Sequence, residues 1–68
     1  MDLQFRALIV LDQAELHGRK FVSRHLAYNK KSRLEAEENY EYSVIMVNGY
    51  YYVIDKENYL MVEEARRM

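Results

Sequence analysis

The chain has 68 residues, half of them apolar, with no cysteine and no proline. It therefore has room for a single domain over residues 1–68 with a small core, and for neither disulfide bonds nor thiolate metal ligands. The net charge of −1 is unevenly distributed, with −2 over residues 1–16, +6 over residues 17–34 and −5 over residues 35–68. The apolar stretch 3–11 is too short to cross a bilayer or to act as a signal peptide, so we expect no membrane partner. The absence of cysteine favours a cytoplasmic protein.

Residues 3–11 begin with alternating apolar side chains and end as a continuous apolar run. This pattern predicts a strand that is covered on one side and partly covered on the other. A short helix is the alternative for this segment. In the strand, one face would carry Leu3, Phe5, Ala7, Ile9 and Leu11.

The next segment predicts one long amphipathic helix over residues 12–38. Asp12 and Glu15 have the spacing of a capping box, and no proline follows them up to Glu38. At about 100° per residue, the cations occupy one half of the helical wheel and the apolar residues the other, so a basic outer face and an inner face packed on a sheet are expected. The outer set is Arg19, Lys20, Arg24, Lys30, Lys31 and Arg33, and the inner set is Phe21, Val22, His25, Leu26 and Tyr28.

Residues 40–55 predict a β-hairpin. Two runs rich in tyrosine and β-branched residues flank Asn48-Gly49, which favours a type I′ turn because both central residues need a positive φ. Both faces of the hairpin are apolar near the turn, so one would cover the core and the other would be free to form an interface. The two-residue loop fixes the pairs as Val47 with Tyr50, Ile45 with Tyr52, and Glu41 with Lys56, the last as an ion pair.

Asp55 is placed to cap a final helix that runs to Met68, with Glu63 and Arg67 as an i,i+4 pair. Together these elements predict an α+β fold of order β-α-β-β-α, in which the basic helix packs on a short sheet that contains the hairpin. A right-handed crossover would make the first strand parallel to a hairpin strand.

A second fold is suggested by short motifs. Glu37-Glu38-Asn39, Ile45-Met46, Asn48-Gly49 and Ile54-Asp55-Lys56 together resemble the hairpin wing and closing helix of excisionase-type winged-helix proteins. Ala14 and Gly18 also have the four-residue spacing of a helix-turn-helix. The resemblance implies an alternative winged helix-turn-helix fold that binds DNA through the basic helix. The sequence departs from the family at Arg24, where an aliphatic residue is usual, and in the wing, which carries tyrosines in place of cations.

Motifs for catalysis or metal binding are lacking. His17 and His25 are eight residues apart, with no carboxylate at a ligand spacing. Neither Ser23 nor Ser32 has the partners of a catalytic triad, and there is no glycine-rich phosphate loop. We therefore expect no enzymatic activity, no metal and no cofactor.

The charge segregation and the tyrosines together indicate a binding surface. We expect a small regulatory protein of the inhibitor or adaptor type that docks on another protein and forms a homodimer; proteins of this size are common among phages and mobile elements. Alternatives are a DNA-binding protein that uses the basic helix, and a structural homo-oligomer whose hairpin edges pair. The predicted partner-binding residues are Arg19, Lys20, Arg24, Lys30, Lys31, Tyr50, Tyr51 and Tyr52.

Overall fold

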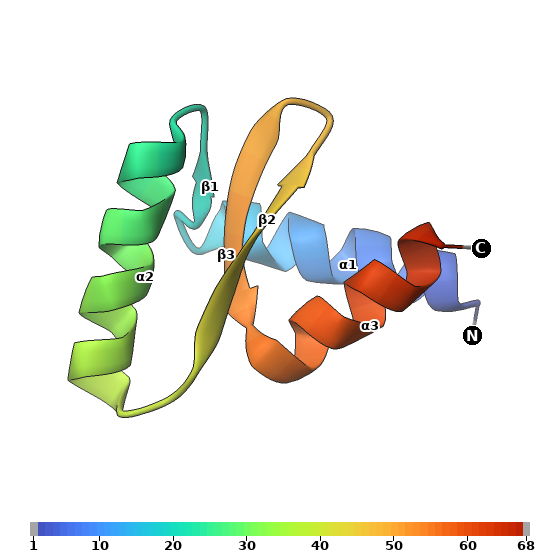
Figure 1. Cartoon of the computed structure of the whole chain (residues 1–68). Helices are drawn as coiled ribbons and strands as arrows, with labels where there is room; N and C mark the ends of the chain where they lie inside the picture. Colours follow the sequence, from blue (N-terminus) through green and yellow to red (C-terminus); the bar gives the residue numbers. More distant parts are fainter. Residues whose placement is uncertain (1, 68) are drawn as a thin grey trace.

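The computed structural model, which describes residues 2–67, has three helices and three strands in an α-β-α-β-β-α order. The strands form one antiparallel sheet in the order β1-β3-β2, with α1 and α3 on one face and α2 on the other (Figure 1). The α+β class is confirmed. The predicted β-α-β-β-α order is wrong, because the chain starts with a helix and β1 pairs antiparallel to β3. The elements are α1 (Leu3–Leu16), β1 (Lys20–Phe21), α2 (Arg24–Glu38), β2 (Tyr42–Val47), β3 (Tyr50–Asp55) and α3 (Lys56–Arg66).

Residues 3–11 belong to helix α1, so their prediction as a strand is wrong and the helical alternative is confirmed. Asp2 caps the helix, and its carboxylate accepts a hydrogen bond from the Gln4 amide at 3.2 Å. The buried residues Ala7, Leu11 and Ala14 recur at helical spacing. The alternation that predicted a strand arises because α1 also carries apolar residues on its opposite side.

Helix α1 ends at Leu16 in a Schellman motif. Gly18 has a φ of +72°, the Gly18 amide donates to the Glu15 carbonyl at 3.0 Å, and the Arg19 amide donates to the Ala14 carbonyl at 2.7 Å. The positive φ favours glycine at this position, since other residues adopt this conformation only at a cost.

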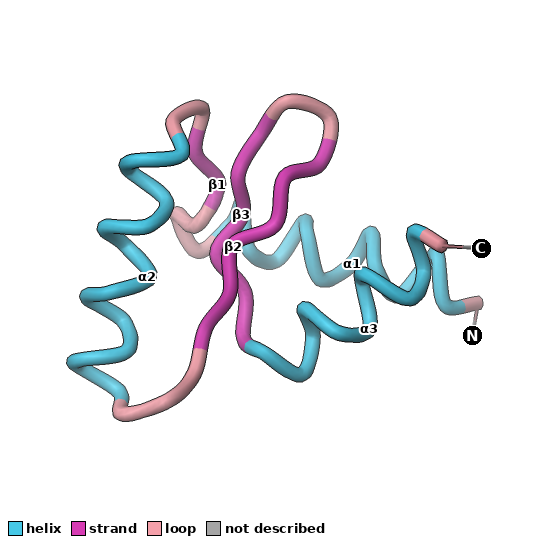
Figure 2. The backbone as a smooth tube through the Cα atoms, viewed as in Figure 1, coloured by secondary structure: helices cyan, strands magenta, loops and turns pink. Residues whose placement is uncertain are grey.

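The predicted continuous helix over 12–38 is therefore wrong, because residues 17–23 form a loop that contains β1 (Figure 2). The loop is held by long-range pairing, since the Val53 amide donates to the Arg19 carbonyl at 2.9 Å. Asp12 lies inside α1 and is not an N-cap. The cap of α2 is Ser23, whose hydroxyl accepts from the Leu26 amide at 3.4 Å.

The interruption also changes which side of α2 faces the sheet. Ala27 and Leu34 are buried there against Tyr42 and Val53. Of the predicted inner set, only Phe21 is half-buried against this cluster, and it lies in β1. The other four, Val22, His25, Leu26 and Tyr28, are exposed, so the predicted inner face is wrong.

The hairpin forms as the Asn48-Gly49 turn predicts. Both turn residues have a positive φ, and β2 pairs with β3 with Val47 opposite Tyr50 and Ile45 opposite Tyr52. Beyond the last pair, Lys56 Nζ lies 3.0 Å from a Glu41 carboxylate oxygen. Asp55 caps α3 by accepting from the Asn58 amide at 3.1 Å.

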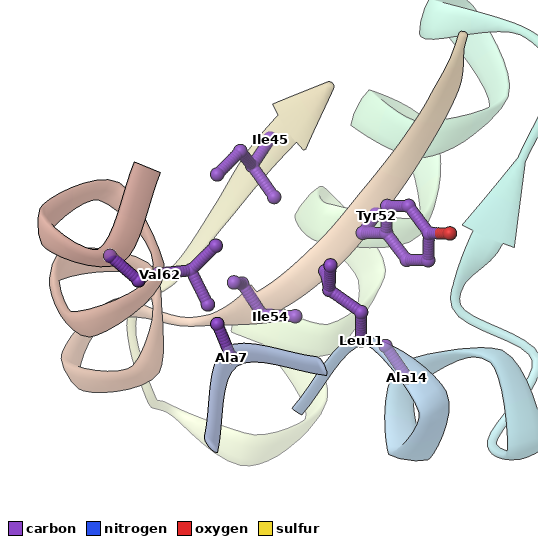
Figure 3. Packing of buried hydrophobic residues seen from close by; sticks show 8 residues of the cluster. Ala7, Leu11, Ala14, Ile45, Tyr52, Ile54 and Val62 are labelled. Carbon is purple, nitrogen blue, oxygen red and sulfur yellow. The ribbon is translucent and has the colours of Figure 1, made fainter. Parts of the chain in front are cut away.

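Both faces of the sheet carry a cluster of buried residues within this chain, but the face under α2 is open near the turn, where Met46 is 52% exposed. The expected interface on one hairpin face stays a prediction. The larger core lies between the sheet, α1 and α3 (Figure 3). Helix α3 ends at Arg66. Glu63 pairs with Arg66, whose guanidinium lies 3.5 Å from the Glu63 carboxylate, and not with Arg67 as predicted. Met68, the predicted end of the helix, lies outside the described residues. The larger core comprises Ala7, Leu11, Ala14, Ile45, Tyr52, Ile54, Val62 and Ala65.

The architecture differs from a helix-turn-helix. Seven residues, 17–23, separate α1 from α2 and include β1, whereas a helix-turn-helix joins its helices by three or four residues. The tip of the hairpin, residues 46–51, carries no cation.

Candidate functional site

Three of the predicted partner-binding cations pair with carboxylates of this chain. Lys20 Nζ lies 3.2 Å from Glu15, and this hydrogen bond holds the pKa of Lys20 above its ordinary value. Lys31 Nζ lies 3.3 Å from Glu35, one helical turn away. The Arg19 guanidinium lies 3.8 Å from Glu38. These three cations are therefore partly neutralised before any partner arrives.

The other predicted partner-binding cations, Arg24 and Lys30, lie on α2 together with Arg33, on the opposite side of the sheet from α1. Arg24 stacks over the Tyr28 ring at 5.3 Å from its centroid. Arg24 and Arg33 are exposed, Lys30 is half-buried, and none of the three has an ion-pair partner within residues 2–67. No carboxylate occurs between residues 24 and 34. This part of α2 is the surface that keeps a basic character.

The three consecutive tyrosines of β3 are covered to different degrees. Tyr52 is only 8% exposed and lies in the larger core, so it is not available to a partner. Tyr51 is half-buried in the cluster under α2. Tyr50 is 40% exposed, and Lys20 Nζ lies 4.1 Å from the centroid of its ring. Among the predicted residues the structure thus brings together Lys20, Tyr50 and Tyr52, and places the cations of α2 elsewhere.

Tyr42 is the centre of a polar cluster that joins α2 to β2. Its hydroxyl donates to Glu38 at 2.5 Å, its amide donates to Glu35 at 3.1 Å, and the Arg19 guanidinium lies over its ring at 5.3 Å. The hydrogen bond to Glu38 raises the pKa of Tyr42, and the bond from the Tyr42 amide lowers the pKa of Glu35. Because Tyr42 is buried and its hydroxyl is hydrogen-bonded, this cluster holds the fold together.

The outer face of α1 is the largest feature that the sequence interpretation missed. It carries Phe5, Leu8, Ile9 and Leu16, which are 53%, 59%, 39% and 77% exposed. At about 100° per residue these four side chains span roughly 100° around the helix, opposite the buried face. We call this set the outer stripe of α1.

An apolar hollow adjoins the outer stripe at Leu8. It lies where α1, α3 and β2 meet, and Leu8, Leu11, Val47 and Val62 line it together with Ala7 and Ala65. Two polar residues, Gln4 and Arg66, complete the lining. The hollow and the stripe form a continuous apolar surface through Leu8, which belongs to both.

The outer stripe could have been found from the sequence. Leu3, Ala7, Val10, Leu11 and Ala14 fit one side of a helix, and Phe5, Leu8, Ile9 and Leu16 fit the other side. Assigning the segment to a strand divides the same residues into two sheet faces and removes the signal.

Other kinds of site find no support within the described residues. No group of three or more histidine, aspartate or glutamate side chains is arranged to hold a metal ion in residues 2–67. None of the helices in that range is long and apolar enough to cross a membrane. Comparisons of the chain with protein-family models, curated proteins and solved structures find no match.

Proposed function

We propose that this chain is a small non-enzymatic binding module that docks on another protein through the outer stripe of α1. One observation carries the proposal: α1 is apolar on both sides, and the structure covers only one of them. A helix that is apolar all round is normally buried on all sides. Exposed apolar patches bordered by polar residues mark protein-interaction surfaces.

The proposal moves the docking surface away from the residues predicted from sequence. Lys20, Lys31 and Arg19 are already paired, and Tyr52 is buried. Tyr50 borders the docking side of the molecule, because it follows Val47 of the hollow across the hairpin turn. It therefore remains a candidate contact at the edge of the surface.

Site-specific photo-cross-linking in cells that naturally contain this chain tests the proposal. The photoreactive aromatic p-benzoylphenylalanine replaces Phe5, whose half-exposed ring tolerates enlargement, and in a matched control it replaces Ser32 on α2. We expect a discrete cross-linked protein from position 5 that is absent from position 32 and is lost when Leu16→Glu is added. Absence of any product from position 5, or an equal product from the double variant, would refute the proposal.

Duplex DNA binding is a second candidate, favoured by the outer face of α2. Exposed His25, Asn29 and Ser32 lie between the cations Arg24 and Arg33, an arrangement suited to a helix that meets phosphates at both edges. An electrophoretic mobility shift at low salt, with Arg24→Ala/Arg33→Ala as the control, tests this candidate. No shift at tens of micromolar protein would exclude it, because non-specific affinity alone should give one.

A further inference from the structure

Asp12 interrupts the outer stripe of α1. It is exposed, and helical spacing places it beside three residues of the stripe. Leu8 lies four residues before it, Ile9 three residues before it and Leu16 four residues after it. Asp12 has no ion-pair partner within residues 2–67. A docked partner would therefore remove this carboxylate from water, which is costly unless the partner supplies a cation.

A second copy of this chain that packs through its own outer stripe does not supply that cation. Arg6 is the only cation of α1, and it lies roughly 120° around the helix from Asp12, beyond the edge of the stripe. Symmetric packing of two α1 stripes would set each Asp12 against apolar side chains of the other copy. The charge pattern thus favours a different chain over the homodimer expected from sequence.

The hollow provides a second recognition element one turn away. Leu8 lines it and precedes Asp12 by four residues, so a side chain in the hollow and one on Asp12 are separated by about 6 Å, one helical turn. Two side chains of a helix at i and i+4, or at i and i+3, have this separation. Helix α1 is 14 residues long, or about 21 Å, and its outer stripe runs from Phe5 to Leu16, enough to contact a helix of similar length.

We propose that the partner surface is an amphipathic helix with a lysine or arginine inside its apolar stripe. The cation would bind Asp12, and an apolar residue one turn away would enter the hollow lined by Leu8, Val47 and Val62. This inference rests on the proposed function, and it adds the chemistry of the partner.

A displayed library of random 18-residue peptides tests the inference without assuming a partner. The library is first depleted of peptides that bind the Leu16→Glu variant. The remaining peptides are then selected in separate experiments for binding to the wild-type chain and to Asp12→Lys. Glu37→Lys, which makes the same charge change on exposed α2, is the matched control. We expect wild type and Glu37→Lys to enrich amphipathic peptides with one fixed lysine or arginine in the apolar stripe, and Asp12→Lys to enrich aspartate or glutamate there.

Affinity measurements on the selected peptides complete the test. Replacing the fixed lysine by glutamine should weaken binding to wild type about tenfold, as for one desolvated ion pair, and leave binding to Asp12→Asn unchanged. Enriched peptides with no fixed cation would overturn the inference and leave the proposed function standing. If no peptide is enriched, or if wild type sediments as a dimer that Leu16→Glu dissociates, the helical partner with a cation is also refuted. Photo-cross-linking from position 5 decides the proposed function separately.

Discussion

The same substitution, leucine to alanine, can be made at a buried and at an exposed position of α1. Comparing Leu11→Ala with Leu16→Ala tests whether the outer stripe is exposed. Leu11 is 9% exposed within the larger core, whereas Leu16 is 77% exposed at the end of α1. Leucine and alanine both favour helices, so helix propensity contributes little to either change. The difference between Leu11→Ala and Leu16→Ala therefore reports how much each side chain is covered in the free protein.

The expected magnitudes differ several-fold. Leucine to alanine removes three carbons, worth about 0.8 kcal/mol each when buried, or about 2.4 kcal/mol. The cavity left at Leu11 raises the loss to about 3–4 kcal/mol, within the usual range of 2–5. At Leu16 only about a quarter of the side chain is covered and no cavity forms, so a loss of at most about 0.6 kcal/mol is expected.

Urea unfolding followed by circular dichroism measures both losses. A domain of this size has a free energy of unfolding of roughly 3–10 kcal/mol and an m-value of about 1 kcal/mol/M. Leu11→Ala should lower the midpoint by about 3 M or leave the chain unfolded, and Leu16→Ala should lower it by less than about 0.6 M. Equal losses would refute the assignment of Leu16 to a free surface. A loss at Leu16 that depends on protein concentration would show that a second copy covers it.

Three further substitutions test local features of the fold by the same unfolding measurement. Gly49→Ala should cost about 1 kcal/mol, because Gly49 has a φ of +83° with open space around it, so the loss is backbone strain alone; no loss would contradict the turn. Asp55→Ala should cost about 1 kcal/mol by removing the cap that accepts from the Asn58 amide, and a change below about 0.3 would contradict that role. Glu35→Gln should destabilise the chain at neutral pH, because the Tyr42 amide lowers the pKa of Glu35 in the folded state. The stabilisation by the Glu35 carboxylate is present above the ordinary glutamate pKa of about 4.3 and is lost as the pH falls through the lowered folded pKa. If the difference in unfolding free energy between wild type and Glu35→Gln became larger below pH 4, the assignment would be refuted.

The hairpin and the cap of α3 could be predicted because local residues determine them. Asn48 and Gly49 adopt a positive φ more readily than other residues, and a two-residue turn leaves one register. Asp55 is the last residue of β3 and accepts from an amide three residues ahead. Neither feature depends on distant parts of the chain.

Residues 17–23 were misassigned because their structure depends on distant contacts, whereas residues 12–16 and 24–38 are helical as predicted. Residues 19–21 lie outside a helix because β3 pairs with them, with Lys20 opposite Tyr52 and Phe21 opposite Tyr51. Local propensity does not contain that information. Gly18 is a signal for a helix end and Ser23 for a helix start. On the wheel of one long helix, however, both residues fit the pattern of polar and apolar faces, so periodicity alone does not detect the break between the two helices.

The same long-range contacts change the meaning of the basic stretch. In sequence, residues 17–34 form a block of six positive charges. In the fold, Arg19, Lys20 and Lys31 meet Glu38, Glu15 and Glu35, so the unpaired charge that remains is on α2.

Salt dependence can therefore distinguish the two candidate surfaces. Binding of DNA through three cations of α2 should weaken roughly forty-fold between 50 and 200 mM salt, at a slope of about −0.9 per phosphate contact. Docking through the outer stripe of α1 depends on apolar contact and on the single carboxylate of Asp12. A pair shielded from solvent is screened little, so the affinity of a selected peptide should change only a few-fold over that range. A steep loss would mean that the cations of α2, and not α1, make the contact.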